Sequence, residues 1–169
     1  MGSGPAFQFE GAFGGDGGPA TEARLNLPQD VEVDSAGVLY VADDGNVRIR
    51  AVDRQGIIRT VLGAGIGEVR HMELDPQGRL FFSAGGMIRH IDEEGNIRTD
   101  LERTNGIFFA PAGDGTLFYI SFLQVWRARP GEAAVAYAGV GFLASAGDGG
   151  PATDARLGFP RGDRHRSGV

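Results

Sequence analysis

An eleven-residue block occurs twice in this chain, and it constrains the fold more than any other feature of the sequence. The segment Gly15–Leu25 returns as Gly147–Leu157, 132 residues later, and the two copies differ only at Glu22 and Asp154. A recurrence of this length is typical of a repeat protein. Because the interval is too long for one repeat unit and suits three, it predicts intermediate units between the two blocks.

Turn signals recur in pairs within that interval. An Asp that accepts hydrogen bonds from backbone N–H groups, followed by a Gly in the left-handed conformation, favours a tight turn between two strands. The first turn of each unit is Asp34–Gly37, Asp75–Gly78 or Ala112–Gly115, and the second is Asp53–Gly56, Asp92–Gly95 or Arg129–Gly131. Short apolar runs separate these turns, and successive first turns lie 41 and 37 residues apart. Each unit is therefore expected to be a four-stranded meander, which is the pattern of a β-propeller blade.

We expect an all-β fold: a β-propeller built of four-stranded antiparallel meander blades, forming an incomplete ring. The propeller segment covers 1–160, and 161–169 is expected to be a disordered or irregular basic tail. A short helical turn is the most helix expected, within Pro19–Leu25. The expected parts are an additional N-terminal outer strand at 6–11, three complete blades at 27–63, 70–102 and 106–139, and an inter-blade loop at 140–160.

The first unit resembles the NHL-repeat β-propeller family. The residues that carry the resemblance are Leu27–Asp34, Leu39–Asp43, Arg48–Asp53 and Thr60–Gly63, and the Gly-Asp-Gly-Gly-Pro-Ala block is similar to an inter-blade loop of bacterial members. The later units depart from the pattern, with Ser83–Gly86 and Ser121–Gln124 in place of Ala42–Gly45. The resemblance implies the propeller fold, but the family includes scaffolds, sensor domains, adhesion proteins and a few enzymes.

Three blades are too few to close a propeller ring, since propellers use about four to eight. An open arc would leave apolar blade faces in water. One solution is self-association, in which two chains complete a six-bladed ring. The alternative is a truncated propeller fragment without independent function.

Polar residues in two kinds of loop are the candidate binding residues. Asp16 and Asp148 lie in the glycine-rich blocks, where the backbone can approach an anion or polar ligand closely. Asp43, Asp44 and Asn46 lie in the turn after the second strand of the first unit. Neither metal nor cofactor is expected, because the other units lack the acids of this turn and His71, His90 and His165 have no zinc-type spacing. His90 is expected to be exposed.

The favoured function is a non-catalytic scaffold or interaction module that binds a protein or glycan partner through these loops. No catalytic residues are assigned, because the chain has neither a Gly-x-Ser-x-Gly motif nor a serine with a recognisable His partner. The alternative is an enzyme similar to the propeller lactonases and lyases, with a metal on the axis; the residues available for it are Glu32, Glu73 and His71. A net charge of −6 argues against nucleic acid as a partner. The sequence predicts no signal peptide or membrane insertion and leaves the compartment open.

Overall fold

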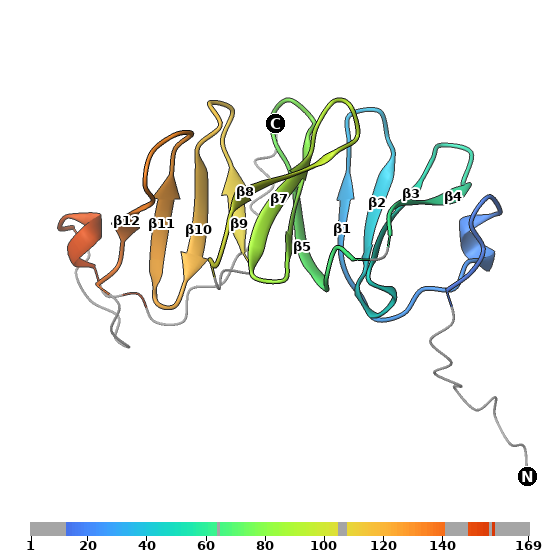
Figure 1. The fold of residues 1–169 in the computed structure, drawn as a ribbon, viewed down its shortest axis with the longest axis horizontal. Coiled ribbons are helices and arrows are strands. Elements are labelled where there is room, and N and C mark those ends of the chain that lie inside the picture. The colour runs from blue at the N-terminus through green and yellow to red at the C-terminus, as the bar shows by residue number, and fades with distance from the viewer. Residues whose placement is uncertain (1–12, 64, 105–107, 141–148, 156, 158–169) are drawn as a thin grey trace, which may run out of the picture. The chain divides into compact units, whose positions relative to one another are not determined.

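The described part of the chain folds into three four-stranded antiparallel sheets, each a simple meander (Figure 1). The computed structural model describes residues 13–63, 65–104, 108–140, 149–155 and 157. The predicted all-β, blade-type fold is confirmed. The expected outer strand at 6–11 and the tail at 161–169 lie outside the described residues.

The strands follow one another in chain order within each sheet. Blade 1 holds β1 (Pro28–Val33), β2 (Leu39–Asp43), β3 (Arg48–Val52) and β4 (Ile58–Leu62). Blade 2 holds β5 (Val69–Leu74), β6 (Leu80–Ala84), β7 (Met87–Ile91) and β8 (Ile97–Leu101). Blade 3 holds β9 (Phe109–Pro111), β10 (Leu117–Ser121), β11 (Gln124–Ala128) and β12 (Val135–Ala138). The described helical structure is three 3-10 turns, η1 (Ala20–Glu22), η2 (Asp44–Asn46) and η3 (Ala152–Asp154).

The turns form by the chemistry that the sequence predicts. In the turn between β1 and β2, the Asp34 carboxylate accepts the Val38 N–H at 2.9 Å, and Gly37 closes the turn with φ +77°. Asp53 in the next turn accepts the N–H groups of Gln55 and Ile57. Because each turn fixes which residues face each other, this short-range chemistry also sets the register of the strands that it joins.

The chain divides into two compact units at Val69 and Arg70. In the second unit, a buried apolar cluster joins blades 2 and 3. Phe81 and Ile88 of blade 2 pack with residues of blade 3, namely Phe109, Leu117, Tyr119 and Ala128. Face-to-face packing of twisted four-stranded sheets is how a propeller buries its apolar side chains.

The first unit carries an apolar strand face that is open to solvent. Ile49 and Ala51 of β3 are buried, whereas Val31 and Val33 of β1 are 49% and 58% exposed. These valines alternate with the half-buried Glu32, as the two-residue period of a strand requires. The exposed face is of the kind that a neighbouring blade would cover.

Phe122 holds a strained backbone position at the tip of the turn between β10 and β11. It is 80% exposed and has φ +55°, a region that favours glycine. The matching turn of blade 2 has Gly85 and Gly86 there, both with positive φ. Because Phe122 has little packing to lose, we expect Phe122→Gly to raise the free energy of unfolding by about 0.5–1 kcal/mol, after allowing for the unfolded-state entropy of glycine. Urea denaturation measures this, with Leu123→Gly as the control that should lose stability; a loss in Phe122→Gly would contradict the interpretation.

Candidate functional site

The first glycine-rich block folds into a compact loop that ends in η1. Gly14 bridges to Arg24, so the two ends of the loop meet. Gly15 has φ +89°, and a Cβ at this position would lie 2.7 Å from the Cα of Ala23. Only glycine fits such a close approach of two backbone segments, which explains one of the glycines in the block. The predicted helical turn within Pro19–Leu25 is confirmed as η1.

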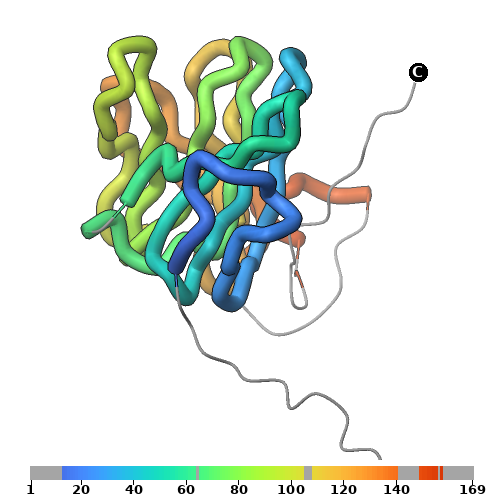
Figure 2. The backbone as a smooth tube through the Cα atoms, turned by 90° about the vertical axis from the view of Figure 1, so that its right-hand side faces the viewer, coloured from blue at the N-terminus to red at the C-terminus, as the bar shows by residue number. Residues whose placement is uncertain are grey.

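This loop pairs with the outer edge of β4. Gly17 donates to the carbonyl of Ile58 at 2.8 Å, and the Ile58 N–H returns a bond to Gly18 at 3.1 Å. Ala20 donates to the Gly56 carbonyl at 2.8 Å. In Figure 2 the loop is drawn in dark blue and lies against the strands of blade 1. The loop therefore satisfies the backbone groups that an outer strand would otherwise expose, which blocks edge-to-edge association there.

Arg50 of β3 is the residue to which the loop is anchored. Its guanidinium, which is 0% exposed, binds the Asp16 carboxylate through Nη2 at 2.6 Å and Nε at 3.2 Å. It also donates to the carbonyl oxygens of Gly14 at 3.1 Å and Arg24 at 3.0 Å. The ring of Phe13 lies 5.1 Å from the same guanidinium. Because the planar guanidinium of a buried Arg holds each of its acceptors in a fixed direction, Arg50 fixes the position of the loop on the blade.

Asp16 completes the edge pairing with its second carboxylate oxygen, which accepts the N–H of Thr60 at 3.1 Å. Burial opposes ionisation of this carboxyl, but hydrogen bonds from Thr60 and Arg50 and the charge of Arg50 outweigh it and lower the pKa of Asp16. The side chain nevertheless remains 33% exposed. Asp16 therefore connects the loop to both β3 and β4.

The lowered pKa of Asp16 predicts how the stability of the first unit depends on pH. A carboxyl whose pKa is lower folded than unfolded contributes fully above its unfolded pKa, about 3.9, and loses the contribution as pH falls through the folded pKa. We therefore expect the melting temperatures of wild type and Asp16→Asn to differ by a constant amount near neutral pH and to converge below about pH 4. Thermal melts between acid and neutral pH measure this, and a gap that persists or widens in acid would contradict it.

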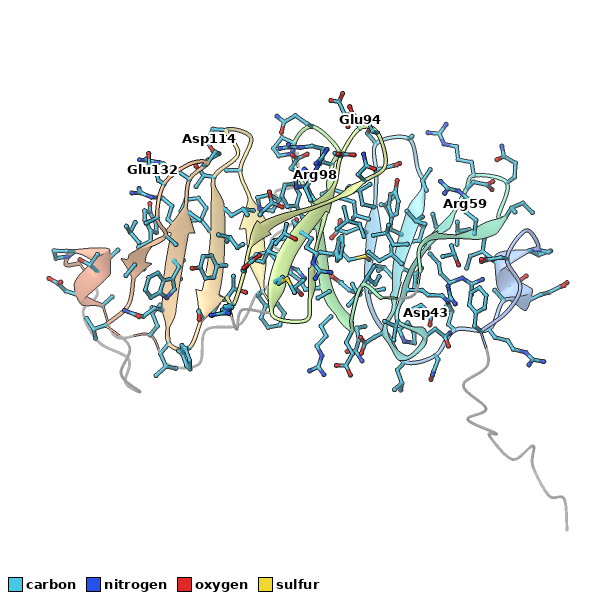
Figure 3. All side chains as sticks on the ribbon, viewed as in Figure 1. Asp43, Arg59, Glu94, Arg98, Asp114 and Glu132 are labelled. Atoms are coloured by element: carbon cyan, nitrogen blue, oxygen red, sulfur yellow. The ribbon has the colours of Figure 1, made fainter. Side chains whose placement is uncertain are left out.

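The turn from β2 to β3 holds the other three candidate residues. Asp43 is fully buried and accepts the Asn26 N–H at 2.7 Å and the Asn46 amide at 2.8 Å. Its carboxylate also lies 3.9 Å from Arg50. Asp44 and Asn46 belong to η2 and are half-buried. Figure 3 labels Asp43 at this end of blade 1.

The structure therefore brings Asp16, Asp43 and Asn46 into one network around Arg50, with Asp44 beside it. The hydrogen bonds of the buried Asp43 carboxylate hold the turn in place, and those of Asp16 hold the loop. Sequence analysis missed Arg50 and Thr60, which complete the network. The repetition of the Arg and Thr pair could have pointed to them, because blade 2 carries Arg89 and Thr99 in the same register.

The second glycine-rich block repeats the conformation of the first in its described part. Pro151 and Ala155 flank η3 with φ values of −57° and −67°, close to the −57° and −74° of Pro19 and Ala23 around η1. Gly139 and Val140, which follow β12, donate to the carbonyls of Ala152 and Ala155 at 2.9 Å. Asp148, the counterpart of Asp16, lies outside the described residues.

Other polar clusters in the described part of the chain are smaller. His71 is buried, with Nε2 3.2 Å from the Phe109 carbonyl and 3.9 Å from Glu73. Across the described ranges, no group of three or more His, Cys, Asp or Glu side chains is placed to hold a metal ion. Nor does the described chain contain a helix long and apolar enough to cross a membrane.

Comparison with known sequences places the first part of the chain among NHL repeats. The family model described as the teneurin NHL domain matches residues 5–71. Teneurin-3 of Danio rerio is 50% identical over 56 residues, and Teneurin-4 of Mus musculus is 46% identical over 56 residues. Each alignment covers 33% of this chain and 2% of the relative, so the chain corresponds to a very small part of these curated relatives.

Solved structures extend the likeness to more of the chain. A gluconolactonase from Xanthomonas campestris aligns with a TM-score of 0.56 and 15% identity, over 68% of this chain and 48% of its own. A chain from a nidogen/laminin complex aligns with a TM-score of 0.54 and 18% identity, over 70% of this chain and 53% of its own. At these identities the likeness establishes the fold alone. The repeated blades and the shared architecture establish the β-propeller fold, and residues 5–71 are similar to the teneurin NHL domain.

Proposed function

We propose that the chain is a non-catalytic interaction module that binds a protein or glycan partner through the turn between β2 and β3. The observation that carries the proposal is the Arg50 network, which anchors the glycine-rich loop and the neighbouring turn to one buried guanidinium. A loop held in one conformation loses little entropy when it binds, which favours recognition.

Within this surface, Asp44 and Asn46 are the proposed contact residues, and Asp16 and Asp43 are the proposed supports. Asp44 and Asn46 are half-buried in η2, whereas the Asp43 carboxylate is already engaged by Asn26 and Asn46. Asp148 is proposed as a contact residue of the second loop on the basis of its sequence. The similarity of residues 5–71 to the teneurin NHL domain supports an interaction role over catalysis.

A binding screen against purified extracellular-matrix proteins and a glycan array tests the proposal. For any ligand found, Asp44→Ala should weaken binding about tenfold or more, as expected for losing a charged contact. Gln55→Ala is the control, because it alters a polar side chain in the turn between β3 and β4, at the opposite end of β3. Equal loss in both variants would contradict this binding surface.

The same preparations should be assayed for lactone hydrolysis with and without divalent cations. Gluconolactonase and lyase structures share the fold, so catalysis is the alternative that this assay addresses. Metal-dependent turnover that disappears in Glu32→Gln or Glu73→Gln would overturn the non-catalytic assignment.

We further propose self-association as the means by which the exposed face of β1 is covered. Val31 and Val33 are the residues that support it. Light scattering should give the mass of two chains for wild type and of one chain for Val33→Glu. A wild-type protein that stays at the mass of one chain would contradict it.

A further inference from the structure

The second glycine-rich block repeats the residues with which the first block binds blade 1. The two copies, Gly15–Leu25 and Gly147–Leu157, differ only at Glu22 and Asp154, and both of these acids are exposed. The first block bonds to blade 1 through Asp16, Gly17, Gly18, Ala20 and Arg24. All five residue types recur in the second block, so its sequence contains what is needed to bind the same kind of strand.

The described part of the second block also has the conformation that binds β4 in the first. Gly17 and Gly149 occupy matching positions, with φ values of +83° and +86°. At both glycines an added Cβ would meet no other atom within 4 Å, so the two sites are equally open. The 3-10 turns η1 and η3 begin three residues after these glycines. The second block therefore needs no rearrangement here to present the same backbone groups.

The two blocks differ in what covers them. Gly18 and Ala20 are half-buried where the first block pairs with the outer strand, whereas Gly150 and Ala152 are exposed. Among the described residues, none bonds to the Gly149 N–H or to the Gly150 carbonyl. A donor and an acceptor placed side by side and open to solvent are what an outer strand can pair with.

We propose that the second block binds the outer edge of β4 in a second copy of the chain, in exchange for the first block of that copy. The Gly149 N–H would donate to the Ile58 carbonyl, and the Gly150 carbonyl would accept the Ile58 N–H. The first block makes these two bonds through Gly17 and Gly18 within the chain, so β4 is a strand already seen to bind this sequence. Exchange of an equivalent element between two copies is a low-cost route to association.

The balance between the two forms depends on how each block is connected to β4. The contacts are equivalent, but the first block is joined to β1 of its own blade by Asn26 and Leu27 alone. So short a connection gives the first block an effective concentration of about millimolar or more. The first block therefore covers β4 in dilute wild-type protein, and the second block of another copy binds when the first is released. This surface is separate from the turn between β2 and β3.

The test measures whether the second block of one chain protects β4 of another. The acceptor is an isotope-labelled full chain with Gly17→Pro and Gly149→Pro, because proline removes each N–H and cannot adopt the positive φ of either position. With both blocks disabled, the Ile58 amide of the acceptor should exchange rapidly. The donor is unlabelled wild type, whose own β4 is covered. Millimolar donor should slow exchange at Ile58 of the acceptor at least about tenfold.

A donor carrying Gly149→Pro is the matched control, because it keeps the first block on its own β4 and loses only the second. It should leave exchange at Ile58 of the acceptor unchanged. The Ile49 amide in the middle of blade 1 reports whether the acceptor is folded. A second acceptor with Asp16→Asn in place of Gly17→Pro makes the comparison independent of the proline in the first block.

The proposal is overturned if wild-type donor leaves exchange at Ile58 unchanged in both acceptors, or if the Gly149→Pro donor slows it equally. The slowing should persist when donor and acceptor both carry Val33→Glu, which separates this site from the self-association proposed through β1. Slowing that is lost with Val33→Glu would also overturn the proposal, because the contact would then belong to the face of β1.

Discussion

Arg50→Met should lower the free energy of unfolding by about 3 kcal/mol. Removing one partner of a buried ion pair costs about 3–5 kcal/mol, because the remaining charges and carbonyl oxygens lose their donors. The lower end of this energy range applies here, because the Asp16 side chain is 33% exposed and water can solvate it when Arg50 is removed. The loss should be largest in the first unit, where the loop would detach from β4. Urea denaturation monitored by circular dichroism measures the change.

Arg98→Met is the control, because Arg98 also binds a carboxylate, that of Asp92 at 2.7 Å, but its side chain is 61% exposed. It should cost clearly less than Arg50→Met. Equal costs would show that Arg50 contributes through general packing of its side chain, and would contradict its role as the anchor of the loop.

Phe81→Ala should lower the free energy of unfolding by about 3–5 kcal/mol, the usual cost of truncating a buried aromatic side chain. Phe81 is 3% exposed and belongs to the cluster that joins blades 2 and 3. The truncation therefore leaves a cavity against Phe109 and Leu117, and both blades should lose stability together. Denaturant unfolding gives the magnitude, and hydrogen exchange shows whether the amides of β10 become less protected along with those of β6.

Phe122→Ala is the control for this truncation, since Phe122 is 80% exposed and outside the cluster. It should change the stability by less than about 0.5 kcal/mol, as is usual for surface sites. Loss of protection confined to blade 2 in Phe81→Ala would contradict the packing of the two blades as one core.

The blade architecture could be predicted because its determinants are local. A turn such as Asp34–Gly37 contains both the acceptor and the glycine that form it, so four residues suffice to place it. The same holds for Asp53–Gly56 and Asp92–Gly95. Repetition of these turns at regular intervals then defined the four-stranded unit, and no long-range contact had to be known.

The anchor of the glycine-rich loop could not be predicted in the same way. Arg50 lies 34 residues from Asp16, and a charged side chain in a strand is ordinarily assigned to solvent. The sequence marked Asp16 and Asp43 as loop acids with carboxylates available to a ligand. Both are in fact engaged within the molecule, because the buried guanidinium of Arg50 lies between them.

The prediction of an exposed His90 was wrong for a similar reason. His90 is half-buried, and its Nδ1 lies 2.7 Å from an Asp100 carboxylate oxygen on the neighbouring strand. The partner comes from the cross-strand register, which the variable residues at this position in the other blades did not reveal. Pairing across strands requires the register before the residue types can be interpreted.

The central claim is that the first glycine-rich block, Gly15–Leu25, covers the outer edge of β4. Amide hydrogen exchange at Ile58 and Thr60 tests this claim most directly. In the wild type both amides donate to the loop, Ile58 to Gly18 and Thr60 to Asp16, and both should be protected. In Asp16→Asn, exchange at these two amides should accelerate at least about tenfold, while the amide of Ile49 in the middle of blade 1 keeps its rate. Equal exchange at Ile58 and Thr60 in the two proteins would contradict the account.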